Sequence, residues 1–340
     1  MIIHYSKPSS DIQIEGKMRL ENDPLLHQRQ AAQVQDLLAS QDRKCCVLCG
    51  QPLTGEQFRH REISAISCST CGHVQTTQLP PPGYPEQEFH KVYPKLTSEG
   101  YEDRKKRIYK PKLDWALNCL QEIGYSFEQL KELKWTEMGC GAGYFLTTLQ
   151  DAGLKHFTGF DADNTLVGIA RSFTKEGKVQ HYDGLLSDAF SVFPADIYVA
   201  FFVLEHIPDA HRFFDVLKSL PKGTIFIFSI PVFGFSCLLE NIFTHNFARN
   251  FDGVLHTQLY TDRSIAYAME RSGFTILAQW IFGQDAADFS RFLINNLSEK
   301  FSQNLLAEFE KKLLEIQDPL QSCLDKSGLA DQRHLIAIKR

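Results

Sequence analysis

The stretch at residues 134–149, KWTEMGCGAGYFLTTL, decides the fold class of this chain. Its first residues form an apolar run that is typical of a buried strand, and its last residues have the apolar spacing of a helix. Between them stand Gly139, Gly141 and Gly143, three glycines in five residues. Glycines between a strand and a helix let the backbone approach a ligand at the carboxyl end of the strand. The stretch therefore predicts a ligand-binding strand–turn–helix unit.

Two features of this turn separate the ligands that it could hold. A dinucleotide-binding turn needs a small residue where this chain has Tyr144. Glu137, just before the glycines, would repel a pyrophosphate, whereas its negative charge suits the cationic amino group of a methionine moiety. The turn therefore favours a sulfonium nucleoside over a dinucleotide.

Apolar runs and helical stretches alternate from residue 131 to the end of the chain. The alternation predicts right-handed crossovers, a parallel sheet and helices on both of its faces. Helices are expected at about 143–152, 163–174 and 209–219, and a helical insertion at about 285–328 precedes the last strand. The seven expected strands are Lys134–Met138, His156–Phe160, Val179–Tyr182, Asp196–Phe202, Thr224–Ile230, Phe274–Phe282 and His334–Lys339. We therefore expect an α/β, doubly wound, seven-stranded sheet.

Four of the nine cysteines form two Cys-x-x-Cys pairs, Cys46 with Cys49 and Cys68 with Cys71, and 18 residues lie between the pairs. A glycine follows each pair, so each can form a tight turn that aims two sulfurs at one point. This spacing is typical of tetrahedral zinc, and four thiolates leave no open position for catalysis. Cys45 has a poorer spacing to Cys49 than Cys46 has. A redox dithiol and free buried thiols are the alternatives to a structural Zn²⁺ site.

The pattern divides the chain into four parts. Residues 1–43 are a polar arm with one amphipathic stretch from Leu25 to Leu38, and residues 44–79 are the zinc-binding module. Residues 80–130 begin as a proline-rich linker to residue 94 and continue as a lid helix from Glu99 to about Ile123. Residues 131–340 form the α/β domain.

Charge and hydropathy exclude several classes of partner. The net charge of −5 argues against a broad nucleic-acid footprint, which needs a basic face. The basic stretch from Arg104 to Lys112 is a possible local patch or, alternatively, a solvated helix face. No segment has the length and apolarity of a membrane span or the pattern of a signal peptide. We therefore expect a cytoplasmic protein with reduced thiols and no membrane partner.

The motif Glu137-Met-Gly-Cys-Gly-Ala-Gly143 resembles the first motif of class I S-adenosylmethionine-dependent methyltransferases, and later landmarks follow in the family's order. The resemblance implies a Rossmann-like sheet whose last strand is antiparallel. It also implies that Asp161 holds the ribose hydroxyls of the donor and that Asp183 meets its adenine amino group. The segment after the fourth strand is expected to line the donor site, and it includes Phe202 and the sequence VLEHIPD from residue 203. The layout of zinc module, linker and methyltransferase is similar to bacterial methyltransferases of sugar and polysaccharide gene clusters.

Methyl transfer is an in-line displacement at a sulfonium methyl group, so alignment and desolvation are the main tasks. A base is needed only where the acceptor must lose a proton. His256 is the preferred candidate, and His206 is the second, although a structural role suits it as well. The segment 231–273 is rich in phenylalanine and predicts either a lid over the acceptor or ordinary packing. Tyr93, Tyr101 and Arg104 are expected to close over the donor from the other side.

The leading hypothesis is an S-adenosylmethionine-dependent methyltransferase that acts on a small-molecule or sugar-type acceptor. The first alternative is an RNA methyltransferase whose zinc module binds RNA, which requires a basic face from that module to the donor site. The second is a non-catalytic S-adenosylmethionine-binding protein, against which the intact glycine turn argues. The sequence does not reveal the oligomeric state or the atom that is methylated.

Overall fold

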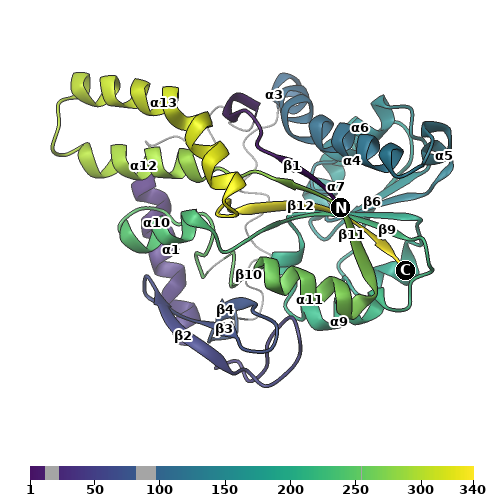
Figure 1. Ribbon diagram of the computed structural model, residues 1–340, viewed down its shortest axis with the longest axis horizontal. Coiled ribbons are helices and arrows are strands. Elements are labelled where there is room, and N and C mark those ends of the chain that lie inside the picture. The colour runs from purple at the N-terminus through teal and green to yellow at the C-terminus, as the bar shows by residue number, and fades with distance from the viewer. Residues whose placement is uncertain (12–22, 82–96, 254) are drawn as a thin grey trace.

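The computed structural model describes residues 1–11, 23–81, 97–253 and 255–340, and an eight-stranded sheet forms its centre (Figure 1). Along the sheet, the strands are β1 (Ile2–Tyr5), β11 (Phe274–Ile281), β12 (Gln332–Lys339), β9 (Ile225–Pro231), β8 (Ile197–Phe201), β5 (Trp135–Met138), β6 (Phe157–Asp161) and β7 (Lys178–His181). β12 is antiparallel to both of its neighbours, β11 and β9, and the other pairs are parallel. The expected sheet and its antiparallel last strand are confirmed.

The count of seven strands was one too low. All seven expected segments are strands of the sheet, and the additional strand is β1, which pairs in parallel with β11 at the edge. The strand is only four residues long, IIHY, at the start of a polar segment, and of these four residues only Ile2 is partly buried. Through β1, the start of the expected N-terminal arm pairs with β11, which lies close to the other end of the chain.

Helices cover both faces of the main sheet. One face packs against apolar side chains of α4 (Lys110–Glu122) and α6 (Tyr144–Asp151). The other face packs against α9 (Ala210–Leu217) and α11 (Asp262–Ser272). This is the doubly wound arrangement that the β-α alternation predicted.

The helical run ahead of β5 contains a change of helix type. It consists of α3 (Ser98–Arg104), a π-helical turn η3 (Lys105–Tyr109) and then α4. π-helical turns are found mostly as short segments within α-helices and often at functional sites. The run confirms the helix expected from Glu99 to about Ile123, whereas most of the proline-rich linker before it lies outside the described residues.

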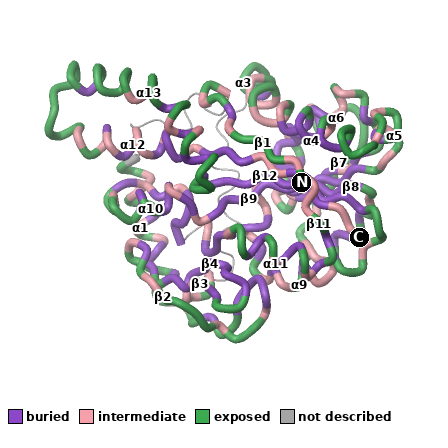
Figure 2. Tube along the Cα trace, viewed as in Figure 1, coloured by how far each residue is buried: buried purple, intermediate pink, exposed green. Residues whose placement is uncertain are grey.

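The helical insertion before the last strand consists of α12 (Asp285–Leu297) and α13 (Gln303–Lys326), which lie side by side and project from the molecule (Figure 1). Figure 2 shows that much of α13 is exposed. In the part of the chain that the structure describes, no helix has both the length and the apolarity needed to cross a membrane.

The paired cysteines lie beside a second, four-stranded sheet. In order, its strands are β10 (Gln258–Leu259), β4 (Val74–Thr76), β3 (Ile63–Cys68) and β2 (Gly55–His60). β10 comes from the segment between β9 and β11, and Leu259 of β10 pairs with Val74 of β4. α1 (Asp23–Leu38) packs on this sheet, since Leu37 and Ile63 share a small apolar cluster. Residues expected as a separate module therefore share a sheet with residues of the α/β domain.

Candidate functional site

The glycine turn connects β5 to α6 at the carboxyl edge of the main sheet. Gly139, Gly141 and Gly143 have φ angles of 63°, 52° and 79°, which favour glycine. A Cβ atom on Gly139 would lie 2.7 Å from Val203, and one on Gly143 would lie 2.8 Å from Ala170. Conformation therefore favours glycine at all three positions, and space also requires it at Gly139 and Gly143, so no side chain from these positions covers the turn.

Glu137 stands at the end of β5, immediately before this turn, and its side chain is only 3% exposed. One carboxylate oxygen, Oε2, has no hydrogen-bond partner. Burial, and then the nearby charge of Asp161, raise the pKa of Glu137 well above its ordinary value, whereas Lys112 acts in the opposite direction. A buried carboxyl group without a partner is costly, and a cation bound beside it would remove that cost.

Asp161 ends β6, the strand next to β5. Its Oδ2 accepts a hydrogen bond of 2.8 Å from the amide of Gly141, and its Oδ1 accepts one of 2.8 Å from the amide of Asp163. Burial raises the pKa of Asp161, although these backbone hydrogen bonds act to lower it. Each carboxylate oxygen has a second lone pair, so this side chain can still accept hydrogen bonds from a diol. Asp183 lies beyond the end of β7 and is exposed.

Stacked aromatic rings cover the glycine turn from the side of α3 and η3. Tyr101 is fully buried, and its ring stacks on Tyr144 at 4.4 Å and on Phe173 at 3.8 Å. Its hydroxyl donates a 3.2 Å hydrogen bond to the carbonyl of Ala142, inside the turn. The guanidinium of Arg104 lies 5.2 Å from the centre of the Tyr144 ring. The structure thus brings Tyr101 and Arg104 to the turn, and Tyr93 lies outside the described residues.

The backbone is strained where β8 ends. Phe202 has a φ angle of 57°, a left-handed conformation that is uncommon for a residue other than glycine. Its amide donates a 2.8 Å hydrogen bond to the carbonyl of Ser229, so β9 helps to hold this conformation. The Nζ atom of Lys112, a buried residue of α4, lies 4.5 Å from the ring centre of Phe201 and 4.7 Å from that of Phe202.

Lys112 is a residue of the site that the sequence did not single out. In sequence it is one member of the basic stretch from Arg104 to Lys112. Other members of that stretch pair with acids on the surface, as Arg107 does with Asp103 and Lys110 with Asp114. Lys112 instead interacts electrostatically with Glu137 and with Glu205, which ties it to the carboxyl edge of the sheet. A basic residue on the apolar side of a helix was the signal that could have identified it.

The two candidate bases lie together. His206 follows β8 in the short helix η4 (Leu204–His206), and its ring centre is 5.1 Å from that of His256. Burial, and then His256, lower the pKa of His206 to about 3, so this ring is neutral near pH 7. Glu205, beside it, is 1% exposed, and burial raises its pKa to about 8.

The phenylalanines of the segment 231–273 pack against other parts of the protein. Phe233 contacts Phe58 of β2 edge to face at 5.6 Å, and Phe251 lies 5.1 Å from His60. Phe243 stacks at 5.5 Å on Phe292 of α12. These three rings therefore fasten the segment to the small sheet and to the helical insertion, as the packing alternative predicted.

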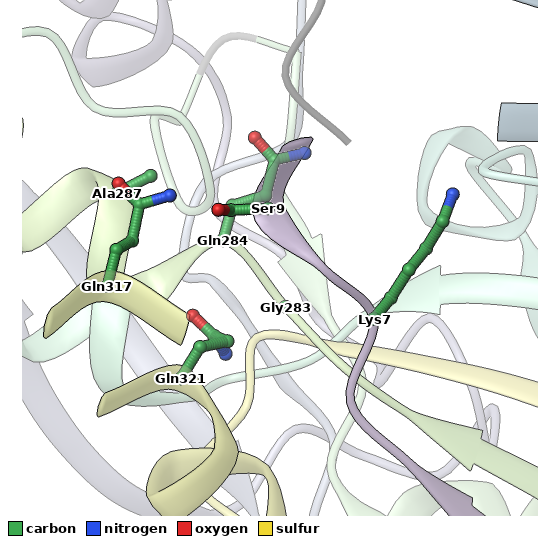
Figure 3. Close-up of a pocket in the computed structure, with 7 residues that line it drawn as sticks. All are labelled: Lys7, Ser9, Gly283, Gln284, Ala287, Gln317 and Gln321. Atoms are coloured by element: carbon green, nitrogen blue, oxygen red, sulfur yellow. The ribbon is translucent and has the colours of Figure 1, made fainter. Parts of the chain in front are cut away.

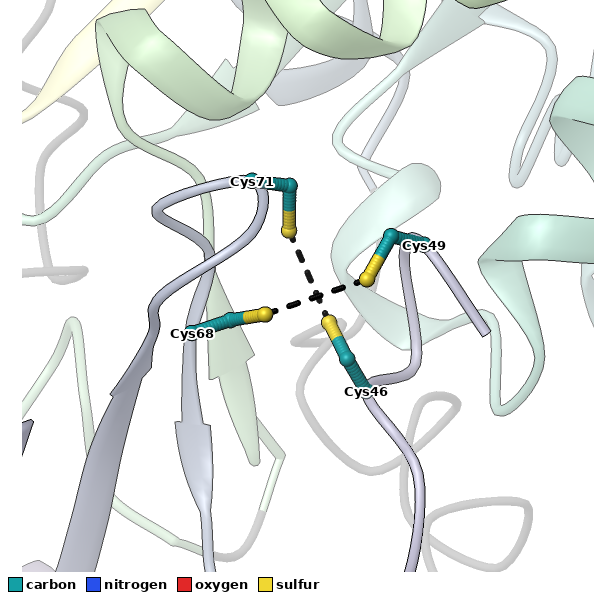
Figure 4. Close-up of side chains that lie close together, drawn as sticks. All are labelled: Cys46, Cys49, Cys68 and Cys71. Carbon is teal, nitrogen blue, oxygen red and sulfur yellow. Dashed lines mark hydrogen bonds between the residues drawn. The ribbon is translucent and has the colours of Figure 1, made fainter. Parts of the chain in front are cut away.

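The four paired cysteines meet at one point, with their side chains converging as Figure 4 shows. The sulfurs of Cys46 and Cys71 are 3.6 Å apart, and those of Cys49 and Cys68 are 3.8 Å apart. Four sulfurs at about 2.3 Å from one ion form a tetrahedron with edges of about 3.8 Å, so the arrangement fits Zn²⁺. The hydrogen bond from the Cys71 thiol lowers the pKa of Cys46 and raises that of Cys71, and burial raises the pKa of Cys49. A bound metal ion would supply the positive charge that stabilises the thiolates.

Hydrogen bonds connect this cluster to the α/β domain. The amide of His211, in α9, donates to the carbonyl of Val47 at 2.8 Å. Arg271 of α11 donates to the carbonyl of Cys49 at 2.7 Å. Nε2 of His73, two residues after Cys71, lies 2.9 Å from Oε1 of Gln258 in β10. The cysteine cluster is therefore built into the domain that carries the glycine turn.

A small cavity lies apart from the groups described so far. It is about 10 Å³ in volume and lies between the N-terminal segment and helices α12 and α13 (Figure 3). Its lining residues are Lys7, Ser9, Gly283, Gln284, Ala287, Gln317 and Gln321. A cavity of this size has room for about one water molecule, so it is too small for a substrate.

The sequence of residues 109–279, just over half of the chain, matches a family model described as Methyltransferase domain. The matched region runs from η3 to β11 and therefore contains the glycine turn, Asp161 and both candidate bases. No curated protein matches the sequence.

Several solved structures resemble the fold. Magnesium protoporphyrin IX methyltransferase from Synechocystis PCC 6803, with bound SAH, is 13% identical with a TM-score of 0.42, and 73% of this chain and 90% of that chain are covered. Geranyl diphosphate C-methyltransferase from Streptomyces coelicolor A3(2) is 10% identical with a TM-score of 0.40, and 73% of this chain and 86% of that chain are covered. An S-adenosylmethionine-dependent methyltransferase from Mesorhizobium loti is 17% identical with a TM-score of 0.39, and 61% of this chain and 91% of that chain are covered. At this level of similarity, their acceptors say nothing about the acceptor of this chain.

Proposed function

We propose that this chain, which belongs to the methyltransferase-domain family and is an S-adenosylmethionine-dependent methyltransferase, holds the methyl donor against the turn at Gly139, Gly141 and Gly143. The observation that carries this proposal is the buried Glu137 carboxyl group, which has an unpartnered oxygen at the start of the turn. Glu137 binds the amino group of the donor, and Asp161 binds its ribose hydroxyls. Asp183 reaches the adenine and Phe202 lines the place of the methyl group.

A ligand that binds only the native state raises its melting temperature. We expect S-adenosylhomocysteine at about 100 times its dissociation constant to stabilise the protein by about 2.7 kcal/mol, which is a shift of a few degrees, and we expect no shift with NAD. Differential scanning fluorimetry measures both. A protein that melts at the same temperature with and without saturating S-adenosylhomocysteine would contradict the donor site.

The acceptor that we propose is a small molecule or a sugar-type compound. The pairing of Arg107 and Lys110 with acids supports this over RNA, because these charges are partly neutralised within α3, η3 and α4. In the reaction, the groups at the carboxyl edge align the acceptor with the donor methyl group and exclude water. A screen of hydroxyl, amine and activated-carbon acceptors for release of S-adenosylhomocysteine tests the proposal. Turnover with RNA and with none of these small molecules would favour an RNA methyltransferase instead.

His256 is the group that we propose to activate the acceptor, with His206 beside it. We expect His256→Ala to lower kcat about 10²-fold or more and to leave S-adenosylhomocysteine affinity unchanged, because the proposed role of this ring is toward the acceptor and not the donor. His156→Ala, at an exposed position just before β6, is the matched control and is expected to have wild-type turnover. If His256→Ala turned over as fast as this control, His256 would have no part in the chemistry.

We also propose a structural Zn²⁺ bound by Cys46, Cys49, Cys68 and Cys71. The basis is the donor set and the sulfur separations, and four thiolates leave no position for a substrate. Elemental analysis of protein purified without chelator should give about one zinc ion per chain, and the double variant Cys46→Ser/Cys49→Ser should lose it. Wild-type protein free of metal would refute the site.

A further inference from the structure

Glu205, His206 and His256 form a second group of potential metal ligands, separate from the four cysteines. One ligand atom from each of the three residues lies within 4.8 Å of those from the other two. The Nε2 atom of His206 is 3.9 Å from Oε1 of Glu205. Glu205 and His206 belong to η4, and His256 lies 50 residues later in the chain, so the fold assembles the group.

Hydrogen bonds fix which ring nitrogen of each histidine faces a ligand. Nδ1 of His206 lies 3.0 Å from the carbonyl oxygen of Leu255, and Nδ1 of His256 lies 2.8 Å from that of Asn250. A carbonyl oxygen only accepts hydrogen bonds, so each Nδ1 carries a proton, and the lone pair that can bind a ligand is the one on Nε2. Metal-binding histidines usually donate their other N–H to a carbonyl or carboxylate in this way.

Glu205 supplies an independent observation that points to a cation. Its side chain is 1% exposed, and neither Oε1 nor Oε2 has a hydrogen-bond partner among the residues that the structure describes. Buried carboxylates are normally paired, hydrogen-bonded or bound to a metal. Lys112 attracts Glu205 electrostatically, so a lysine–carboxylate interaction is the competing explanation that a test must distinguish.

We propose that Glu205, His206 and His256 bind a divalent first-row transition-metal ion, and that this ion holds a hydroxyl group of the methyl acceptor. Two imidazoles and one carboxylate are a ligand set for such ions, with positions left open for water or substrate. The role of the ion in turnover rests on the proposed methyltransferase function, whereas its binding does not. The site differs in donor type from the four thiolates, which favour Zn²⁺.

The three ligand atoms would have to move closer together to share one ion. Ligand atoms at about 2.0–2.2 Å from one ion are about 3.0–3.4 Å from each other. The 3.9 Å between His206 Nε2 and Glu205 Oε1 exceeds this by less than about 1 Å, and all three ligand atoms lie within 4.8 Å of one another. His206 is 18% exposed, so the site is open on one side to water or to an acceptor.

The ion would activate the acceptor without a separate strong base. A metal-bound hydroxyl is far more acidic than a free one, so it loses its proton to solvent near neutral pH. The oxygen lone pair then forms the O–CH₃ bond, and the S–CH₃ bond breaks with its electron pair left on the neutral thioether sulfur. His256 therefore acts as a ligand of the ion, and the acceptor class that this site selects is a hydroxyl compound.

Mn²⁺ is the probe that tests this site, because bound Mn²⁺ loses the six-line electron paramagnetic resonance signal of the free ion. The full-length protein is dialysed against citrate, and its zinc content is confirmed at one ion per chain before Mn²⁺ is added. We expect the wild type to bind one Mn²⁺ per chain, and we expect His256→Ala and Glu205→Gln to bind it at least about tenfold more weakly. His156→Ala is the matched control and should bind Mn²⁺ as the wild type does.

Two results would overturn the proposal. One is a wild-type protein that leaves Mn²⁺ free at millimolar concentration, and the other is Mn²⁺ binding that neither His256→Ala nor Glu205→Gln weakens. The S-adenosylhomocysteine melting shift, measured on the same samples, shows whether each variant is folded and whether the donor site is present. A rise in melting temperature with S-adenosylhomocysteine but no Mn²⁺ binding would contradict the metal site alone. Mn²⁺ binding without such a rise would contradict the donor site alone.

Discussion

Two acidic side chains at the carboxyl edge of the main sheet define the chemistry of this protein at the scale of single residues. Glu137 and Glu205 are both almost fully buried, and each has carboxylate oxygen without a hydrogen-bond partner. Packing alone does not explain such groups, because an apolar residue or a glutamine of the same size would cost less. In our proposals, each acid has a positively charged partner: the amino group of the donor for Glu137, and a metal ion for Glu205.

Replacing Glu137 by glutamine keeps its size and removes its charge. We expect Glu137→Gln to weaken S-adenosylhomocysteine binding by roughly 10- to 100-fold, because a hydrogen bond between two charged groups contributes about 1.5–3 kcal/mol. Isothermal titration calorimetry measures the affinity. Glu122→Gln, at an exposed position at the end of α4, is the control and should bind as the wild type does. Equal affinities for the two variants would show that Glu137 does not contact the donor.

The same residue predicts a pH dependence of donor binding. Burial, and then the charge of Asp161, raise the pKa of Glu137 in the free protein, so at pH values below that pKa its proton leaves when the cationic amino group binds. Affinity for S-adenosylhomocysteine should therefore rise with pH, and binding should release a proton, as long as the ligand's amino group stays protonated. Calorimetry in buffers of different ionisation enthalpy counts that proton. Glu137→Gln should abolish the release, and a proton count that the variant leaves unchanged would assign it to another group.

At the scale of elements, the glycine turn depends on both backbone conformation and space. Gly143 and Gly153 have nearly the same φ angle, 79° and 77°, but only Gly143 is crowded, by Ala170. We expect Gly153→Ala to cost about 1 kcal/mol of unfolding free energy and Gly143→Ala to cost about 1–3 kcal/mol more. Urea unfolding measures both. Gly143→Ala should also weaken S-adenosylhomocysteine binding, and equal losses of stability in the two variants would mean that the turn accommodates a Cβ atom.

Elements with a local signal were predictable from the sequence. Each of the seven expected strands is a strand of the main sheet, because central parallel strands such as β8 and β9 are buried on both faces and appear as apolar runs. β1 has no such signal, since it is an exposed edge strand whose partner, β11, is far away in the chain. β10 is only two residues long, and its pairing with β4 depends on the packing of the whole segment.

The candidate site also contains residues that a short motif identifies and residues that only the fold brings together. The glycine turn and the two cysteine pairs are encoded within short windows, so their spacing identified them. His206 and His256 were each predictable as candidates, but their meeting with Glu205 depends on how the segment after β9 folds back. Lys112 belongs to no motif, and only its place on the apolar side of α4, with Trp115 and Cys119, distinguishes it from the exposed basic residues beside it.

At the scale of the whole molecule, the cysteine cluster and the α/β domain share one hydrophobic core. The same cluster of buried residues contains Cys46 and Val47, Phe213 and Phe214 of α9, and Tyr260 beside β10. β10 also connects the small sheet to the segment that carries His256. If the cysteines bind Zn²⁺ as we propose, loss of the ion should therefore disturb the carboxyl edge of the main sheet as well as the small sheet.

Cys46→Ser tests this coupling, with Cys45→Ser at the adjacent exposed cysteine as its matched control. Loss of one zinc ligand removes binding free energy that is also folding free energy. We expect Cys46→Ser to unfold in a single calorimetric transition at least about 5 °C below the wild type, and to bind S-adenosylhomocysteine more weakly, whereas Cys45→Ser should match the wild type. Because the core is continuous, the two parts should melt together. Two separate transitions in Cys46→Ser, with the upper one at the wild-type temperature, would show that the cysteine module folds independently of the methyltransferase domain.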